Sequence, residues 1–155
     1  MWIELLFIGK IREPFIVNGS DYFQERLRHY CRLTLTELAI RDQGLSAEDQ
    51  RAAEHRLLLS KLKPRHALVV LDERGQSVTS PGLAANIERW GNSGMDRLQI
   101  VVGGSYGLTD EMRQKAHWVW SLSPLTFPHP LVRLILLEQL YRAFSILHHQ
   151  PYHHG

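Results

Sequence analysis

The key segment of this 155-residue chain reads Trp120-Ser-Leu-Ser-Pro-Leu-Thr-Phe-Pro-His-Pro-Leu-Val-Arg133 and leads into an apolar helical pattern. It begins as a short strand and continues as a loop containing Pro124, Pro128 and Pro130. Prolines restrict the backbone of such a loop, so its N–H and C=O groups are held in place without being used in a helix or a sheet. A loop of this kind can offer those groups to a ligand.

Two further loops follow predicted strands. Leu71-Asp-Glu-Arg-Gly75 ends one hydrophobic run, and Gly103-Gly-Ser-Tyr-Gly107 ends another. In open α/β sheets, ligands bind beside the carboxyl ends of the strands. The three loops together therefore predict a nucleoside pocket.

Length and composition predict one domain over residues 1–155, since 44% hydrophobic residues can form a substantial core. Cys31 is the single cysteine, no secretory leader is visible, and no apolar run reaches the ~18 residues that span a bilayer, so we expect a cytoplasmic protein. The formal charge of +2 permits an RNA partner without indicating one. The segment from His129 onward is neutral to positive, so we expect an anionic partner to dock there.

Hydrophobic periodicity predicts an alternating order of five strands and five helices. The strands are expected at 3–8, 33–40, 66–71, 98–102 and 119–122, and the helices at 21–30, 46–62, 80–91, 109–117 and 129–148. Ser46 and Ser80 are the expected caps of the second and third helices. This order predicts an α/β fold with a mainly parallel sheet and helices on both faces.

The glycine-rich loop after the fourth strand has two interpretations. Backbone amides in Gly103-Gly-Ser-Tyr-Gly-Leu108 could bind an anion, because a helix follows them. The spacing matches neither a dinucleotide fingerprint nor a Walker loop, and for an isolated Gly-Gly pair a tight turn is the favoured explanation. Its position at a strand end is more informative than its pattern.

The last predicted helix carries two polar pairs with a spacing of four residues, which places each pair on one face. They are His129 with Arg133 and Glu138 with Arg142. Glu138 and Arg142 could simply form an exposed ion pair of about 0.3–0.5 kcal/mol. The rest of the helix is apolar nearly all round, so it requires two packing partners, its own sheet and plausibly a second subunit.

The histidine-rich end of the chain also has several interpretations. We expect no metal site from His148, His149, His153 and His154, because their spacing matches no zinc signature and no cysteine is near. Tyr152 and His153 could act on a substrate, since histidine titrates near neutrality and tyrosine stacks on bases, or they could belong to a disordered tail. A serine hydrolase is not supported, because no G-x-S-x-G elbow is present.

Taken together, several motifs resemble a known family. The chain resembles the small bacterial large-subunit rRNA pseudouridine N3-methyltransferases, the RlmH type of the SPOUT superfamily. Three segments carry this resemblance: Ser121–Arg133, Glu138-Gln-Leu-Tyr-Arg-Ala-Phe144 and Pro151-Tyr-His153. Leu71-Asp72 and Gly103-Gly104 fall where that family has them, and the length matches. The resemblance implies a C-terminal trefoil knot, an obligate homodimer and S-adenosylmethionine as the cofactor.

The resemblance also implies site residues. The cofactor positions carried over are Leu71, Gly103, Gly104, Leu122, Ser123, Pro124, Leu125, Thr126 and Phe127. The same three loops were predicted from the residues alone. Leu71, Leu122, Leu125 and Phe127 would surround the adenine, while main-chain groups bond its edge.

The implied substrate is a pseudouridine in a stem-loop of 23S rRNA, methylated at N3 in the assembled ribosome, so free RNA should be a poor substrate. We expect the nucleobase that accepts the methyl group to be contacted by His153, Tyr152 and Arg142, with Glu138 orienting Arg142. His129 and Arg133 would meet phosphate or support the knot. In a dimer, the tail of one subunit would reach the pocket of the other.

One position departs from the family, which commonly has Arg or Lys after Tyr-His where this chain has His154. Two rivals stay open. A nucleotide-binding oxidoreductase predicts a glycine-rich turn after the first strand, where the chain has only Gly9-Lys10. A ribosome-binding factor without turnover would keep the same fold.

Overall fold

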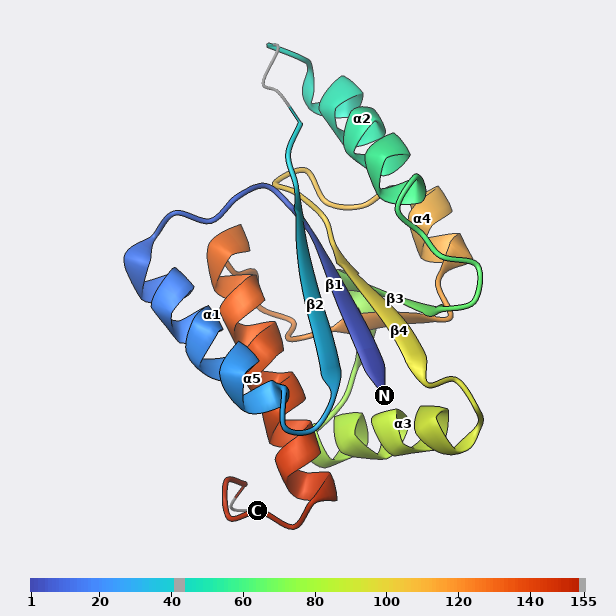
Figure 1. The fold of residues 1–155 in the computed structure, drawn as a ribbon. Coiled ribbons are helices and arrows are strands. Elements are labelled where there is room, and N and C mark those ends of the chain that lie inside the picture. The colour runs from blue at the N-terminus through green and yellow to red at the C-terminus, as the bar shows by residue number, and fades with distance from the viewer. Residues whose placement is uncertain (41–43, 154–155) are drawn as a thin grey trace.

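The computed structural model describes residues 1–40 and 44–153. The chain alternates strands and helices (Figure 1). The strands are β1 (Trp2–Ile8), β2 (Arg32–Leu38), β3 (Ala67–Ser77), β4 (Arg97–Val102) and β5 (Trp118–Ser121). The helices are α1 (Pro14–Leu27), α2 (Ala47–Leu59), α3 (Ser80–Asn92), α4 (Asp110–Lys115) and α5 (His129–Leu147).

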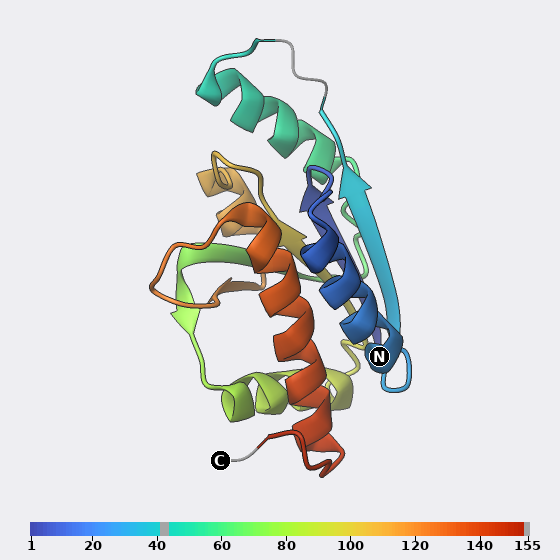
Figure 2. The ribbon, with the colours of Figure 1, turned by 90° about the vertical axis from the view of Figure 1, so that its left-hand side faces the viewer.

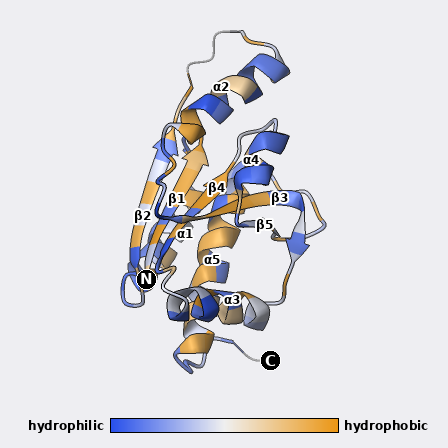
Figure 3. Cartoon of the chain, turned by 90° about the vertical axis from the view of Figure 1, so that its right-hand side faces the viewer, coloured by the Kyte–Doolittle hydropathy of each residue, from blue (hydrophilic) through white to orange (hydrophobic). Residues whose placement is uncertain are grey.

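The five strands form one parallel sheet in the order β2-β1-β4-β3-β5. The predicted parallel α/β architecture is therefore confirmed. Helices α1, α3 and α5 cover one face, with α5 lying between the other two, and α2 and α4 cover the opposite face (Figure 2). Parallel strands buried on both faces carry continuous apolar runs, and the central strands are the most hydrophobic part of the chain (Figure 3).

Each face of the sheet has its own core. Alternate residues of β1 point to opposite sides: Ile3, Leu5 and Phe7 pack under α5, whereas Leu6 and Ile8 pack under α2 and α4. On β5, the rings of Trp118 and Trp120 stack with centroids 5.2 Å apart. Among the described residues, no helix is both long and apolar enough to cross a membrane.

The first helix was predicted wrongly at its start. It begins at Pro14 rather than Asp21 and contains Gly19. A proline fits the first turn of a helix, where no backbone N–H is needed. A Cβ atom on Gly19 would lie 2.8 Å from Leu134 Cδ1 of α5, so the glycine allows the two helices to pack closely.

Two other boundaries also differ from the prediction. Strand β3 does not end at Leu71: Leu71 and Gln76 both pair with Trp120, so residues 72–75 bulge outward and the strand resumes. Gly75 is essential to this geometry, because a Cβ atom there would lie 2.7 Å from the backbone carbonyl of Val119. The cap of α3 is Thr79, not Ser80, whereas the Ser46 side chain caps α2 as expected.

Candidate active site

A cavity of about 570 Å³ opens beside the bulge of β3 and the carboxyl ends of β4 and β5. It is lined by the three loops that the sequence singled out, together with the start of α5. From the predicted cofactor set, the lining includes Leu71, Gly103, Gly104, Leu122, Ser123, Leu125, Thr126 and Phe127. Pro124 is not among the lining residues.

The loop before α5 forms one wall and is fixed by its own hydrogen bonds. Ser121 Oγ donates to the carbonyl of Ser123 at 3.0 Å, and the backbone N–H of Leu125 donates to Ser123 Oγ at 3.0 Å. The Leu125 side chain is 71% exposed although it borders the cavity. An exposed leucine beside a cavity suits a flat apolar ligand group, because binding would remove that surface from water.

The glycine loop after β4 forms the opposite wall. It makes the tight turn expected from its composition, in which Gly107 N–H donates to the Gly104 carbonyl at 3.0 Å and Gly107 has φ +71°. A Cβ atom on Gly104 would lie 2.6 Å from Oε2 of the buried Glu54. The turn therefore brings bare backbone to the cavity surface.

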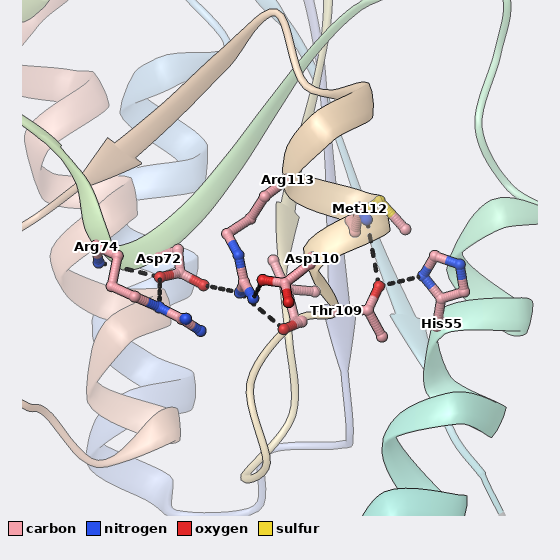
Figure 4. A network of polar contacts seen from close by, with 8 residues as sticks. His55, Asp72, Arg74, Thr109, Asp110, Met112 and Arg113 are labelled. Atoms are coloured by element: carbon pink, nitrogen blue, oxygen red, sulfur yellow. Dashed lines mark hydrogen bonds and ion pairs between the residues drawn. The ribbon is translucent and has the colours of Figure 1, made fainter.

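A polar network supports the β3 bulge (Figure 4). Arg113 of α4 donates to Asp72 Oδ2 at 2.6 Å and to the Leu108 carbonyl at 2.8 Å, and it also pairs with Asp110. The hydrogen bond from Arg113 lowers the pKa of Asp110 below its usual value. The network thus ties two loops of the cavity to α4.

The Asp72 carboxylate lines the cavity and is 8% exposed. Sequence reasoning assigned it no role, as it assigned none to its neighbours Glu73 and Arg74 or to Arg51 of α2, which also line the cavity. Asp72, Glu73 and Arg74 could have been identified from the sequence, because they directly follow a predicted buried strand. Arg51 carried no such signal, because it lies on a surface helix whose packing is set by tertiary contacts.

The polar residues at the start of α5 are anchored to the sheet. His129 lines the cavity, and its Nε2 lies 2.7 Å from the carbonyl oxygen of Ile8, so this nitrogen donates. Burial lowers the pKa of His129. Arg133 is 5% exposed, pairs with Glu37 of β2 and lies over the Phe7 ring at 4.3 Å. Its position suits the supporting role that we proposed as an alternative to phosphate binding, and phosphate contact stays a prediction.

The predicted catalytic residues on α5 and the tail are adjacent to one another. Arg142 Nε and Nη2 donate to Glu138 Oε1 at 2.9 and 2.5 Å, and Tyr152 Oη donates to the same oxygen at 3.2 Å. The Arg142 guanidinium lies 4.8 Å from the centroid of the Tyr152 ring. Burial, reinforced by Glu138, raises the pKa of Tyr152. The phenol is therefore protonated at neutral pH and can act as a hydrogen-bond donor.

The end of the chain folds back onto α5. Tyr152 packs edge-on against Tyr141 with ring centroids 4.7 Å apart. His153 follows directly, and its buried Nδ1 has no hydrogen-bond partner among the described residues. His154 lies outside the residues that the structure describes, and within those described no group of three or more His, Cys, Asp or Glu side chains is arranged to hold a metal ion.

The cavity and the Glu138–Arg142–Tyr152 group are at different ends of α5. Arg142 lies thirteen residues after His129, which corresponds to about 20 Å along the helix axis. A ligand in the cavity and a group held at Arg142 of the same chain would therefore be too far apart to react with each other.

These features agree with the comparisons to known proteins. The family described as "Predicted SPOUT methyltransferase" matches residues 1–153. A probable methylase family protein from Haemophilus influenzae shares the fold, with a TM-score of 0.56 at 12% identity over 99% of this chain and 70% of its own. The chain belongs to the SPOUT methyltransferase family and is a methyltransferase.

Curated relatives extend over the full length. The chain is 43% identical to the ribosomal RNA large subunit methyltransferase H of Pelobacter propionicus, over 99% of this chain and 100% of that protein. The protein of the same name from Geobacter sulfurreducens is also 43% identical with the same coverage. The resemblance noted in the sequence is therefore confirmed.

Proposed function

We propose that this protein methylates N3 of a pseudouridine in a stem-loop of 23S rRNA, using S-adenosylmethionine and acting on the assembled ribosome. The full-length similarity to proteins named ribosomal RNA large subunit methyltransferase H supports the rRNA substrate. The resemblance of the Tyr152-His153 tail and the loop before α5 to the pseudouridine N3 family supports the finer specificity. A ribosomal substrate also agrees with a cytoplasmic location and with one catalytic domain over residues 1–155.

The cavity fits the proposed cofactor. Its volume of about 570 Å³ is within the range of small-ligand sites, and Leu71, Leu122 and Phe127 provide an apolar surface for an adenine ring. Gly103, Gly104 and Gly107 present backbone groups without side chains to the cavity, which suits recognition of the edge of a base. S-adenosylmethionine would supply an electrophilic methyl group on its sulfonium, and no metal is required for such a transfer.

The chain's own residues would act on the acceptor. In the proposed transfer the N3–methyl bond would form as the methyl–sulfur bond breaks, leaving a neutral thioether, and the N3 proton would pass to His153 or to water. Negative charge develops on the neighbouring carbonyl oxygens as N3 loses its proton. Arg142 can stabilise that charge, and Glu138 fixes its guanidinium. The Tyr152 hydroxyl donates to the same Glu138 oxygen and so helps to hold the pair in place, and His153, which follows it directly, would face the nucleobase.

We propose a homodimer because the two halves of the site are about 20 Å apart along α5. In a dimer, Arg142 and the tail of one protomer would complete the cavity of the other. The partly buried apolar side chains of α5, such as Val132 and Ile146, suit such an interface. The trefoil knot that the family resemblance implies stays a prediction for this chain.

The decisive experiment incubates the protein with tritiated S-adenosylmethionine and undermethylated ribosomes, with separated subunits and free 23S rRNA in parallel. We expect label only with assembled ribosomes, on one pseudouridine at N3. Label on another nucleotide would overturn the proposed specificity. Cofactor binding without label on any substrate would favour a ribosome-binding factor, and a stabilising shift with NADH alone would favour an oxidoreductase.

Mixing two inactive variants tests the shared site. Gly103→Val should disrupt the cavity wall, because even a Cβ atom there would lie 3.0 Å from Leu108, which also lines the cavity. Arg142→Ala removes the donor at the other end of α5. Random exchange of protomers should restore about a quarter of the activity, since half of the dimers then contain one complete site. No recovery after verified exchange would show that each chain completes its own site.

A further inference from the structure

A cluster of basic side chains surrounds Trp2 at the end of the sheet opposite the cavity. The parallel register places Trp2 of β1 directly between Arg32 of β2 and Arg97 of β4. Their guanidinium carbons lie 4.9 and 5.6 Å from the centroid of the Trp2 ring, and Lys63 Nζ lies 5.2 Å from it. We call these four residues the Trp2 cluster.

The indole ring is held firmly in the cluster. Its Nε1 donates to Thr34 Oγ1 at 3.4 Å, and the ring of His66 meets it edge-on with centroids 5.6 Å apart. Burial lowers the pKa of His66, so this ring is neutral at pH 7 and adds no charge. Three cations within about 6 Å of an aromatic ring are each attracted to its electron-rich face. Their positions are therefore restricted before any ligand binds.

The carboxylates nearby neutralise the cluster only in part, and Arg32 keeps its full charge. Glu4 pairs with Lys63 at 2.8 Å but is largely buried, and it also accepts a hydrogen bond from Gln99. Asp96 is 4.0 Å from Arg97, at the limit of an ion pair. Over the described part of the chain, Arg32 is exposed and forms no ion pair with a carboxylate.

The cations are also accessible to solvent. The side chains of Lys63 and Arg97 are 42% and 50% exposed. Lys61 and Arg65, both exposed, lie in the same connection between α2 and β3 as Lys63. This end of the molecule therefore presents a positive surface, although the whole chain carries a formal charge of only +2.

We propose that the Trp2 cluster binds the phosphate backbone of structured RNA and forms a second contact with the substrate, remote from the cavity. Planar guanidinium groups match phosphate geometry, and basic side chains interleaved with an aromatic ring are typical of nucleic-acid surfaces. A membrane is a poorer fit, because the indole is covered by cations and leaves no apolar face to insert.

The proposal rests on the rRNA substrate proposed above. β1 joins the two contacts: its first residue, Trp2, belongs to the cluster, and the carbonyl of its last residue, Ile8, bonds to His129 at the cavity. Six residue steps of a strand span roughly 20 Å. Two contacts at that separation can orient a folded RNA more firmly than either contact alone.

The test compares two double variants with the same loss of charge. Arg32→Gln with Arg97→Gln removes two cations of the cluster, and Arg56→Gln with Arg89→Gln removes two exposed cations elsewhere. For the cluster variant we expect a KM for ribosomes at least about tenfold higher, an unchanged kcat, and a salt dependence of binding that is shallower by about two units of log–log slope. The control should match the wild type, and both variants should keep its melting temperature and cofactor affinity.

Three outcomes would overturn the proposal. The first is a cluster variant with the KM and salt slope of the control, while the wild type labels rRNA. The second is a photo-crosslink from position 32 to a ribosomal protein instead of RNA. The third is binding to anionic vesicles that the cluster variant loses without a change in KM. Absence of label with the wild type would instead count against the proposed function. The proposed RNA contact could still be tested in that case, because binding of the two variants to ribosomes can be compared without cofactor.

Discussion

The two ends of α5 carry polar pairs with the same spacing but different surroundings. At the amino-terminal end, His129 bonds to β1 and Arg133 to β2, and within the described residues no hydrogen bond joins the two side chains. At the carboxyl-terminal end, Glu138 and Arg142 pair within the helix and are 20% and 27% exposed. Helical spacing therefore identifies a shared face, but tertiary packing decides whether a pair supports the fold or remains available for chemistry.

Among the changes that test this difference, removal of Arg133 should have the largest effect on stability. Arg133→Ala removes a buried side chain that packs over Phe7 and pairs with Glu37, so we expect the free energy of unfolding to fall by about 2 kcal/mol. Arg142→Ala, the matched change at the other end, should cost less than about 1 kcal/mol. Urea unfolding measures both. Equal losses would show that the two ends do not differ in structural role.

Methyltransferase activity should respond in the reverse order, with Arg142→Ala more damaging than Arg133→Ala. Arg142→Ala should lower kcat about 100-fold or more, because one donor to a developing charge is lost. Cofactor affinity, measured by calorimetry, should stay unchanged, since the cavity is at the other end of α5. His153→Ala should likewise reduce turnover far more than cofactor affinity. Full activity of His153→Ala on assembled ribosomes would remove that residue from the mechanism.

Lowering the pH should destabilise the protein through the amino-terminal end of α5, and this is the smallest of the three expected effects. The folded state lowers the pKa of His129 below its ordinary value of 6.5, so it favours the neutral ring. The unfolded chain takes up the proton first as pH falls, and stability is complete above about pH 6.5 and decreases below it. His129→Gln keeps an N–H donor without titrating, so its unfolding free energy should depend less on pH. The residual dependence should come partly from His66, whose pKa is lowered in the same way. If His129→Gln left the pH dependence of the unfolding free energy unchanged, His129 would not be a source of that dependence.

The sequence predicted those features that depend on local pattern. Continuous apolar runs located the strands, and Ser46 was identified as a cap from its spacing to Asp49. The three loops of the cavity could be predicted because chain order and parallel pairing bring strand ends together. Close packing was not predictable in this way. Gly19 lies inside α1, before the predicted start of that helix, and its role follows only from the packing of Leu134 against it.

The Trp2 cluster was missed for a related reason. Its residues come from β1, β2, the connection before β3, and β4, and only the sheet register brings them together. No window of sequence contains more than one of the four. The Glu138–Arg142 pair was visible in the sequence, but its contact with Tyr152 depends on how the tail folds back onto α5.

The stacked rings of Trp118 and Trp120 give the protein a built-in optical probe. Parallel indoles 5.2 Å apart couple electronically, and Trp120 is almost completely buried one residue before the end of β5. The loop that follows forms a wall of the cavity. Circular dichroism in the near ultraviolet can therefore follow ordering of this wall without any attached dye, through indoles on the strand beside the cavity and Trp90, which packs against Trp118.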